Sequence, residues 1–302
     1  MSKPLTEKWC FPSRALSVAG LILCAAAAQA APVIEKVQGF DENEDFFNEE
    51  FFAGERPSFP GVAFPPGAST LLVADQPVPG RSTLLLVAPP KNGQGRVSRT
   101  ALEISDPINL AFDAANRGAE GHGIFRLFLL EKGSNELLAL KTGARGAIDP
   151  ASLHRVTAQQ LGVANPQGMT VDPASGELFI LDGGAGSPQL LRIKAQLGRR
   201  FDGAAATRIT LPTNLQNLRG IAFNPADGHL YLLSSTQQKL YEVTVAGELL
   251  ASLDMGGYQP GELQGMVFAP SVDLTDPPLV FHLYVAARGG PHRGLTEWSL
   301  KR

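Results

Sequence analysis

The sequence predicts an all-β protein, a β-propeller of five or six four-stranded blades, and three observations carry that prediction. The composition combines 44% hydrophobic residues with 32 glycines and 23 prolines in 302 residues, which is typical of short strands joined by many turns. The segment NPQGMTVDPASGELFILD (165–182) returns as NLRGIAFNPADGHLYLLS (217–234). A spacing of about 50 residues is typical of repeat units that cannot bury their faces alone.

The first thirty residues have the features of an export signal. Three basic residues precede an apolar run from Ala15 to Ala27, and Ala28-Gln29-Ala30 has the small-x-small pattern of a cleavage site. The run is shorter than the roughly 20 residues of a membrane anchor. A lipid attached at Cys24 is disfavoured, because Leu23 stands where that pattern needs a small residue. We therefore expect residues 1–30 to be a signal peptide, and the mature protein to be periplasmic or extracellular.

The expected mature chain contains no cysteine, because Cys10 and Cys24 both lie inside the signal. A disulfide framework, a thiolate nucleophile and a thiolate metal site are therefore excluded. Without residues 1–30 the chain keeps 23 basic and 28 acidic residues, a formal charge of −5. No basic stripe with interleaved aromatic residues occurs, so nucleic acid is not an expected partner.

Residues 31–59 hold two features ahead of the repeats. Val33–Val37 contains both apolar and polar residues, and we interpret it as a strand with one buried face. Gly39–Pro57 then mixes acidic residues with five phenylalanines. Such carboxylates could capture Ca²⁺ or dock on a partner, but they lack the spacing of a calcium loop. We favour a surface flap that buries its phenylalanines and leaves its acids in solvent.

Five copies of one pattern fill residues 60–302. The copies begin at Pro60, Ile108, Gln167, Arg219 and Gln264. Counted from Gly61, Asn109, Gly168, Gly220 and Gly265, the intervals are 48, 59, 52 and 45 residues. This spacing favours propeller blades over a β-solenoid, whose rungs are shorter, and over a β-sandwich, which has no reason to repeat one pattern.

The third copy shows the four strands of one blade. Met169–Val171 and Leu178–Leu181 are joined by a turn at 172–176, and Leu190–Ile193 and Thr207–Thr210 follow. The runs are apolar at consecutive positions, which predicts burial of both faces between neighbouring blades.

Several small features fit the same blade pattern. Gly168, Gly220 and Gly265 are expected where the inner strands crowd at the axis. Matching turn residues, which we expect to cap the backbone, are Asp113, Asp172 and Asn224. A helical turn is expected within Ala151–Leu161.

The last blade needs a strand from elsewhere in the chain. The fifth copy supplies three strands, Gly265–Phe268, Leu279–Ala286 and Leu295–Leu300. We predict that Val33–Val37 completes this blade as its outer strand. The blade number stays at five or six, because residues 31–60 could hold a degenerate copy.

The repeat P-x-G-φ-x-φ-D/N-P-x-x-G-x-L-φ-φ-x-D/S, in which φ is apolar, resembles that of NHL-like and gluconolactonase-like β-propellers, as in exported bacterial surface proteins. The resemblance covers nearly the whole mature chain and is strongest in the copies that begin at Gln167 and Arg219. It implies the fold and leaves the activity open, since this fold hosts hydrolases, ligand binders and scaffolds.

The resemblance implies one alternative function, a metal-dependent hydrolase of lactonase or phosphoesterase type. Gluconolactonase-like propellers hold a divalent cation near the axis through an acidic residue, an Asn and an Asp. The five positions before the inner-strand Gly or Asn contain no acidic residue. Asp106, Asn165 or Asn217 could still supply oxygens nearby, so Ca²⁺ stays open as a ligand and no other cofactor is indicated.

Other catalytic motifs are absent from the sequence. It contains no G-x-S-x-G, no H-E-x-x-H and no phosphate-binding glycine loop. The five histidines lack metal-ligand spacing and are interpreted as turn or strand-surface residues: His122, His154, His229, His282 and His292.

The function that remains is an exported, non-catalytic propeller that binds a protein, peptide or glycan on one face of the ring. Enzymatic activity is left open, with the residue pattern against it. No membrane span is expected in the mature chain. The expected ligand-binding residues surround the axial mouth: Asn165, Gln167, Asn217, Arg219 and Gln264.

Overall fold

The computed structural model describes residues 31–302 apart from 41–60, 64–70, 79–80, 92–93, 103, 105–106, 113–124, 132, 143–147, 184–187, 195–200, 202–205, 272–276, 278–279, 289 and 292–293. The chain divides into two units, Met1–Ala30 and Ala31–Arg302, and the described residues all lie in the second. For most of strands β2 to β5 the backbone alone is described.

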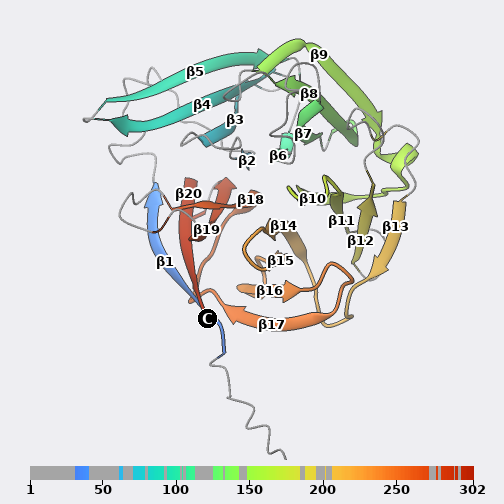
Figure 1. Ribbon diagram of the computed structural model, residues 1–302, viewed down its shortest axis with the longest axis vertical. Helices are drawn as coiled ribbons and strands as arrows, with labels where there is room; N and C mark the ends of the chain where they lie inside the picture. Colours follow the sequence, from blue (N-terminus) through green and yellow to red (C-terminus); the bar gives the residue numbers. More distant parts are fainter. Residues whose placement is uncertain are drawn as a thin grey trace, which may run out of the picture. The chain divides into compact units, whose positions relative to one another are not determined.

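The described strands form five antiparallel sheets of four strands each (Figure 1). From one edge to the other, the sheets are β2 (Gly61–Ala63), β3 (Leu71–Val78), β4 (Arg81–Lys91) and β5 (Gln94–Leu102); β6 (Pro107–Phe112), β7 (Phe125–Glu131), β8 (Glu136–Thr142) and β9 (Ile148–Thr157); β10 (Pro166–Val171), β11 (Leu178–Asp182), β12 (Gln189–Ile193) and β13 (Ala206–Thr210); β14 (Leu218–Asn224), β15 (His229–Ser234), β16 (Lys239–Val243) and β17 (Leu249–Asp254); and β18 (Glu262–Pro270), β19 (Phe281–Arg288), β20 (Gly294–Lys301) and β1 (Val33–Phe40).

The first strands of the five sheets form the inner ring of a β-propeller. β2 contacts β6, β6 contacts β10, β10 contacts β14, β14 contacts β18, and β18 returns to β2. This cyclic order confirms the predicted propeller, and within the described ranges the blade number is five.

Both faces of the blades are buried, as the consecutive apolar runs predict. Along β11, Leu178 and Ile180 pack in a cluster shared with the β6–β9 sheet. Phe179 and Leu181, on the opposite face, pack in a cluster shared with the β14–β17 sheet. Since side chains alternate along a strand, an unbroken apolar run is what a strand sandwiched between two neighbouring sheets requires.

The inner glycines lie where the strands approach closely. A Cβ atom added to Gly220 would lie 2.6 Å from Cδ2 of Leu263 and 2.7 Å from Sδ of Met266, which both extend from the neighbouring inner strand β18. A Cβ on Gly168 would lie 3.3 Å from the amide nitrogen of Asn109 and from Cγ2 of Ile221. The predicted crowding at the axis is therefore confirmed at both positions.

The last blade is closed by the N-terminal strand, as predicted. β1 pairs antiparallel with β20, from Val33 opposite Lys301 to Phe40 opposite Leu295. Ile34 is buried in the cluster between the β14–β17 and β18–β20 sheets. The acidic and aromatic segment lies outside the described residues, except that its first two residues end β1.

Two smaller expectations concern the turn caps and a helical turn. Asp172 and Asn224 cap their turns, since their Oδ1 atoms accept from the backbone N–H of Ala174 at 2.8 Å and Ala226 at 3.0 Å, while Asp113 lies outside the described residues. The expected helical turn is confirmed at the end of its range, as the 3-10 helix η3 (Ala158–Leu161). The rest of the range, Ala151–Thr157, belongs to β9, which pairs with β8 at the sheet edge.

A buried tyrosine makes the fold sensitive to alkaline pH. Tyr258 packs edge-on against Trp298 at 5.1 Å, and burial raises its pKa from 10.0 to about 12. The unfolded chain therefore loses this proton first, so stability from Tyr258 is complete below pH 10 and is lost as pH rises towards about 12. We expect Tyr258→Phe to reduce the fall in unfolding free energy over this range by about 1.4 kcal/mol per pH unit. Urea unfolding at a series of pH values measures it, and equal slopes would contradict the assignment.

Candidate functional site

A β-bulge lies at the start of four inner strands. The pairing register shifts between Pro107 and Asn109, Pro166 and Gly168, Leu218 and Gly220, and Leu263 and Gly265. The skipped residues are Ile108, Gln167, Arg219 and Gln264. Because a bulge turns one side chain away from the ladder, Gln167 and Arg219 can face the axial opening. The four skipped positions include three of the residues that the sequence predicts at the mouth.

Side chains from two bulges meet at this end of the ring. Arg219 donates through Nη1 to the amide oxygen of Gln167, which joins β14 to β10. Gln167 donates through Nε2 to Oδ1 of Asn165 at 2.8 Å. Asn165 donates in turn to the carbonyl oxygen of Gly183 at 3.3 Å. We call Asn165, Gln167 and Arg219 the mouth ladder; Asn165 and Arg219 are exposed and Gln167 is half-buried.

A buried carboxylate fixes the loop that carries Asn165. Asp182, at the end of β11, is 3% exposed and accepts from the backbone N–H of Asn165 at 2.7 Å and of Ala164 at 3.1 Å. This role of Asp182 was not predicted from the sequence. The available signal was the last position of the repeat, which is Asp182 in this copy and Ser234 in the next. Ser234 likewise accepts from a backbone N–H, that of Gln237, at 3.3 Å.

The other two residues predicted at the mouth, Asn217 and Gln264, have no described hydrogen bond to the mouth ladder. Asn217 is exposed, precedes β14 and has a positive φ of 53°, a conformation that Asn tolerates better than most residues. No described hydrogen bond joins its side chain to the mouth ladder. Gln264 occupies the bulge of β18, and its side chain lies outside the description.

Asn109 is the exception among the inner positions that follow a bulge. The corresponding residues of β10, β14 and β18 are glycines, whereas β6 has Asn109, which is fully buried. Within the described part of the chain, neither Oδ1 nor Nδ2 of Asn109 has a hydrogen-bond partner. Its amide lies against Gly168, which directly follows Gln167 of the mouth ladder.

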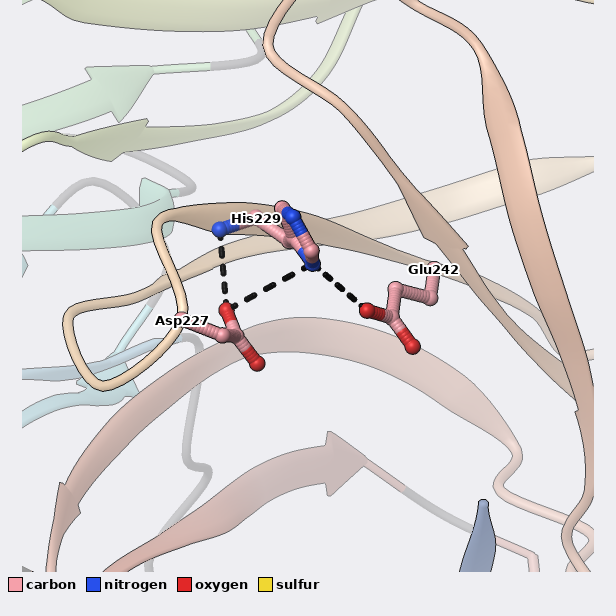
Figure 2. A group of neighbouring side chains, drawn as sticks. All are labelled: Asp227, His229 and Glu242. Atoms are coloured by element: carbon pink, nitrogen blue, oxygen red, sulfur yellow. Dashed lines mark hydrogen bonds and ion pairs between the residues drawn. The ribbon is translucent and has the colours of Figure 1, made fainter. Parts of the chain in front are cut away.

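A second polar cluster lies at the opposite end of β14. Figure 2 shows His229, at the start of β15, between Asp227 and Glu242. Nδ1 of His229 lies 2.6 Å from Oε1 of Glu242 and 3.9 Å from Oδ1 of Asp227. One imidazole and two carboxylates are donor types that bind divalent cations.

Arg302 occupies the position where a cation would neutralise this cluster. Its Nη2 lies 2.7 Å from Oδ2 of Asp227, 2.5 Å from Oε1 of Glu242 and 2.6 Å from the Tyr231 hydroxyl. Burial, together with the hydrogen bond to Asp227, raises the pKa of Tyr231 above its ordinary value, so this hydroxyl stays protonated. The guanidinium links the last two blades, and we interpret the cluster as a structural ion-pair network.

The same arrangement recurs in the last blade. His282 lies 2.7 Å through Nδ1 from Oε1 of Glu297, and the Tyr284 hydroxyl donates to the same oxygen at 2.8 Å. Tyr231 pairs with Glu242 across the strands as Tyr284 pairs with Glu297. His282 is 6% exposed, so its interpretation as a turn or strand-surface residue is wrong, whereas His229 is half-buried at the start of β15 and agrees with it. The strand register brings each histidine against a glutamate. The repeated His-Leu-Tyr at 229–231 and 282–284 was the available signal.

The third sheet has the reverse charge order at this position. Glu177, before β11, accepts from Nε of Arg192 on β12 at 2.7 Å, and Phe179 pairs with Arg192 in the same register. The last three sheets therefore all have an interacting polar pair at this position, although the acidic residue and its partner exchange strands in the third sheet. We interpret this pair as a structural element of the blade.

Comparison with known proteins gives similarity in structure alone. No family model matches the chain, and no curated protein does. The nidogen/laminin complex matches with 15% identity over 77% of this chain and 72% of that one, at a TM-score of 0.47. A gluconolactonase from Xanthomonas campestris matches with 16% identity over 79% and 74%, at 0.45. The PQQ-bound aldose sugar dehydrogenase from Streptomyces coelicolor matches with 13% identity over 90% and 99%, at 0.46. The fold assignment depends on the strand pairing described above.

Proposed function

We propose that the protein is an exported, non-catalytic β-propeller that binds a protein, peptide or glycan ligand at the axial mouth. The observation that carries the proposal is the mouth ladder, a chain of exposed and half-buried polar side chains built on two bulges. The supporting framework is rigid, since the residues between the bulge and the turn pair along the whole of β10 and β14. Polar groups held in this way are pre-organised for a ligand.

Export is supported by the features of residues 1–30, with a basic start, an apolar run and a small-x-small site. Among the residues that the structure describes, no helix has both the length and the apolar character that a membrane crossing requires.

The alternative class, a metal-dependent hydrolase, fits the mouth less well. A divalent cation there would need several oxygens to converge on it. The amide oxygen of Gln167 already accepts from Arg219, and a guanidinium beside the site repels a cation. We expect CaCl₂ and EDTA to give the same melting temperature; a calcium-dependent rise would favour the hydrolase.

A binding screen tests the proposal directly. Immobilised protein of residues 31–302 is exposed to a peptide display library and to a glycan array, and each ligand is re-tested on Gln167→Ala/Arg219→Ala. The double variant is expected to lose binding at least about tenfold, since each lost charge-assisted contact weakens a complex by that order.

Lys194→Gln is the matched control for this screen. Lys194 is exposed and follows β12 at the end of the blade away from the bulges. It removes one positive charge without touching the mouth, so binding is expected to be unchanged. Ligands that bind the double variant as tightly as the parent would place the binding surface elsewhere and overturn the proposal.

A further inference from the structure

Arg219 holds a positive charge that no contacting carboxylate neutralises in the described part of the chain. Arg155, Arg192 and Arg302 each donate to one or two carboxylates. Arg219 instead donates to the neutral amide of Gln167. Asp182, which lies beside the mouth ladder, already accepts two backbone N–H groups. A planar guanidinium with free donors is the side chain best suited to a carboxylate.

Asn109 supplies a second and independent observation. A fully buried amide has a donor and an acceptor that lose hydration on folding, and almost all such groups find a partner. Asn224 is the comparison within this chain, because it is also buried and its amide donates to Asp227 at 2.7 Å and accepts from Ala226 at 3.0 Å. Asn109 has neither kind of partner among the described residues. Its Nδ2 lies 3.3 Å from where a Cβ of Gly168 would be, and Gly168 directly follows Gln167 of the mouth ladder.

From these two observations we infer that the axial mouth binds the carboxylate of an acidic peptide, with Arg219 as the anion-binding residue and Asn109 as the buried polar group that the bound peptide satisfies. The inference rests on the proposed function and names the class of its ligand. A carboxylate accepts from Arg219 and replaces the amide oxygen of Gln167, which is a weaker acceptor because it is neutral. The peptide group next to the acidic side chain offers both the N–H and the C=O that a primary amide such as Asn109 requires.

Because the protein has a net negative charge, binding of an acidic peptide is a specific test for a local cationic site. The mature chain is acidic, with 28 acidic against 23 basic residues, so its overall field repels an acidic peptide. Binding of such a peptide would therefore need a local cationic site.

The probe is a fluorescein-labelled hexaglutamate peptide, followed by fluorescence anisotropy with protein of residues 31–302. We expect saturable binding that weakens with added NaCl. Arg219→Gln is expected to weaken it by at least about tenfold, and Arg219→Lys by less, because Lys keeps the charge but loses the planar pair of donors. Lys194→Gln is expected to leave it unchanged. Absence of binding, equal binding of hexaglutamine, or equal binding by Arg219→Gln would overturn the inference.

Asn109→Ala separates a binding role from a structural one. If ligand satisfies the amide, the variant binds hexaglutamate more weakly, yet the free protein melts at the same temperature or higher, because an unsatisfied buried group has been removed. Asn224→Ala is expected to lower the melting temperature, since it removes a satisfied cap. An Asn109→Ala protein that loses as much stability as Asn224→Ala would mean that the amide is satisfied within the fold, and would overturn the role of Asn109.

The two proposals fail in different ways. If the library yields ligands that lack carboxylates and depend on Arg219 and Gln167, the proposed binding function stands and the carboxylate inference is wrong. If hexaglutamate binds and Arg219→Gln abolishes its binding, both stand.

Discussion

Removal of Ala31–Gly39 is expected to lower the melting temperature by about 10 °C, because several kcal/mol of strand pairing and packing are lost from a domain of this size. The deletion takes away nearly all of β1, whose residues from Val33 to Phe40 pair with β20. It also removes Ile34, which is buried against the last blade, and the ion pair of Glu35 with Lys301. Thermal unfolding of proteins that start at Ala31 and at Phe40 measures the effect.

Single substitutions in β1 separate packing from chain length. Ile34 is 7% exposed and Val37 is 48% exposed, so Ile34→Asn is expected to be destabilising and Val37→Asn nearly neutral. The shortened protein is also expected to associate at high concentration, because β20 becomes a free edge strand. An unchanged melt after the deletion would contradict closure of the last blade by β1.

Loss of the buried carboxylate at Glu297 is the other large expected effect. Glu297 is fully buried, and its Oε1 is shared by the Tyr284 hydroxyl and by Nδ1 of His282. Glu297→Ala leaves both groups buried without this partner and opens a cavity in the last blade. We expect a loss of about 3–5 kcal/mol in the free energy of unfolding, measured by urea titration.

Two matched variants test the cause of that loss. Glu297→Gln keeps the shape and an oxygen acceptor for Tyr284, so it is expected to lose roughly 1–2 kcal/mol. Glu248→Ala removes an exposed glutamate from the turn between β16 and β17, and should change stability by less than about 0.5 kcal/mol. If Glu297→Ala behaves like Glu248→Ala, the buried network contributes nothing to the fold.

The architecture was predictable because the apolar residues of the repeat indicate which faces of its strands are buried. Leu178–Leu181 is apolar at every position, and only a strand covered on both faces needs that pattern. The turn from Asp172 to Gly176 fixed the hairpin, since Pro and Gly restrict φ there and Asp172 caps it. Val33–Val37 was predicted to be a strand with one buried face; in β1, at the edge of a sheet, Ile34 is buried, whereas Val33 is 51% and Val37 48% exposed.

The polar contacts were less predictable because they depend on register between strands. Nothing in the sequence alone places Glu242 opposite Tyr231 or Glu297 opposite Tyr284, since a shift by one residue would turn each to the other face. Asn109 could be aligned with the inner glycines, but only the packed structure shows that its amide has no hydrogen-bond partner among the described residues. The bulges could not be predicted for the same reason, because an extra residue in one strand can be recognised only when its pairing with the partner strand is known.

The bulges of four inner strands set one residue of each strand apart from the pairing that stabilises the blade. Ile108, Gln167, Arg219 and Gln264 are skipped by the strand ladder, while the residues after them carry the pairing. Under the proposed function, these four positions can change without altering the strand pairing, in the way that antibody loops diversify on a constant framework. We expect a combinatorial library at these positions to give variants that differ in ligand binding and unfold at similar temperatures.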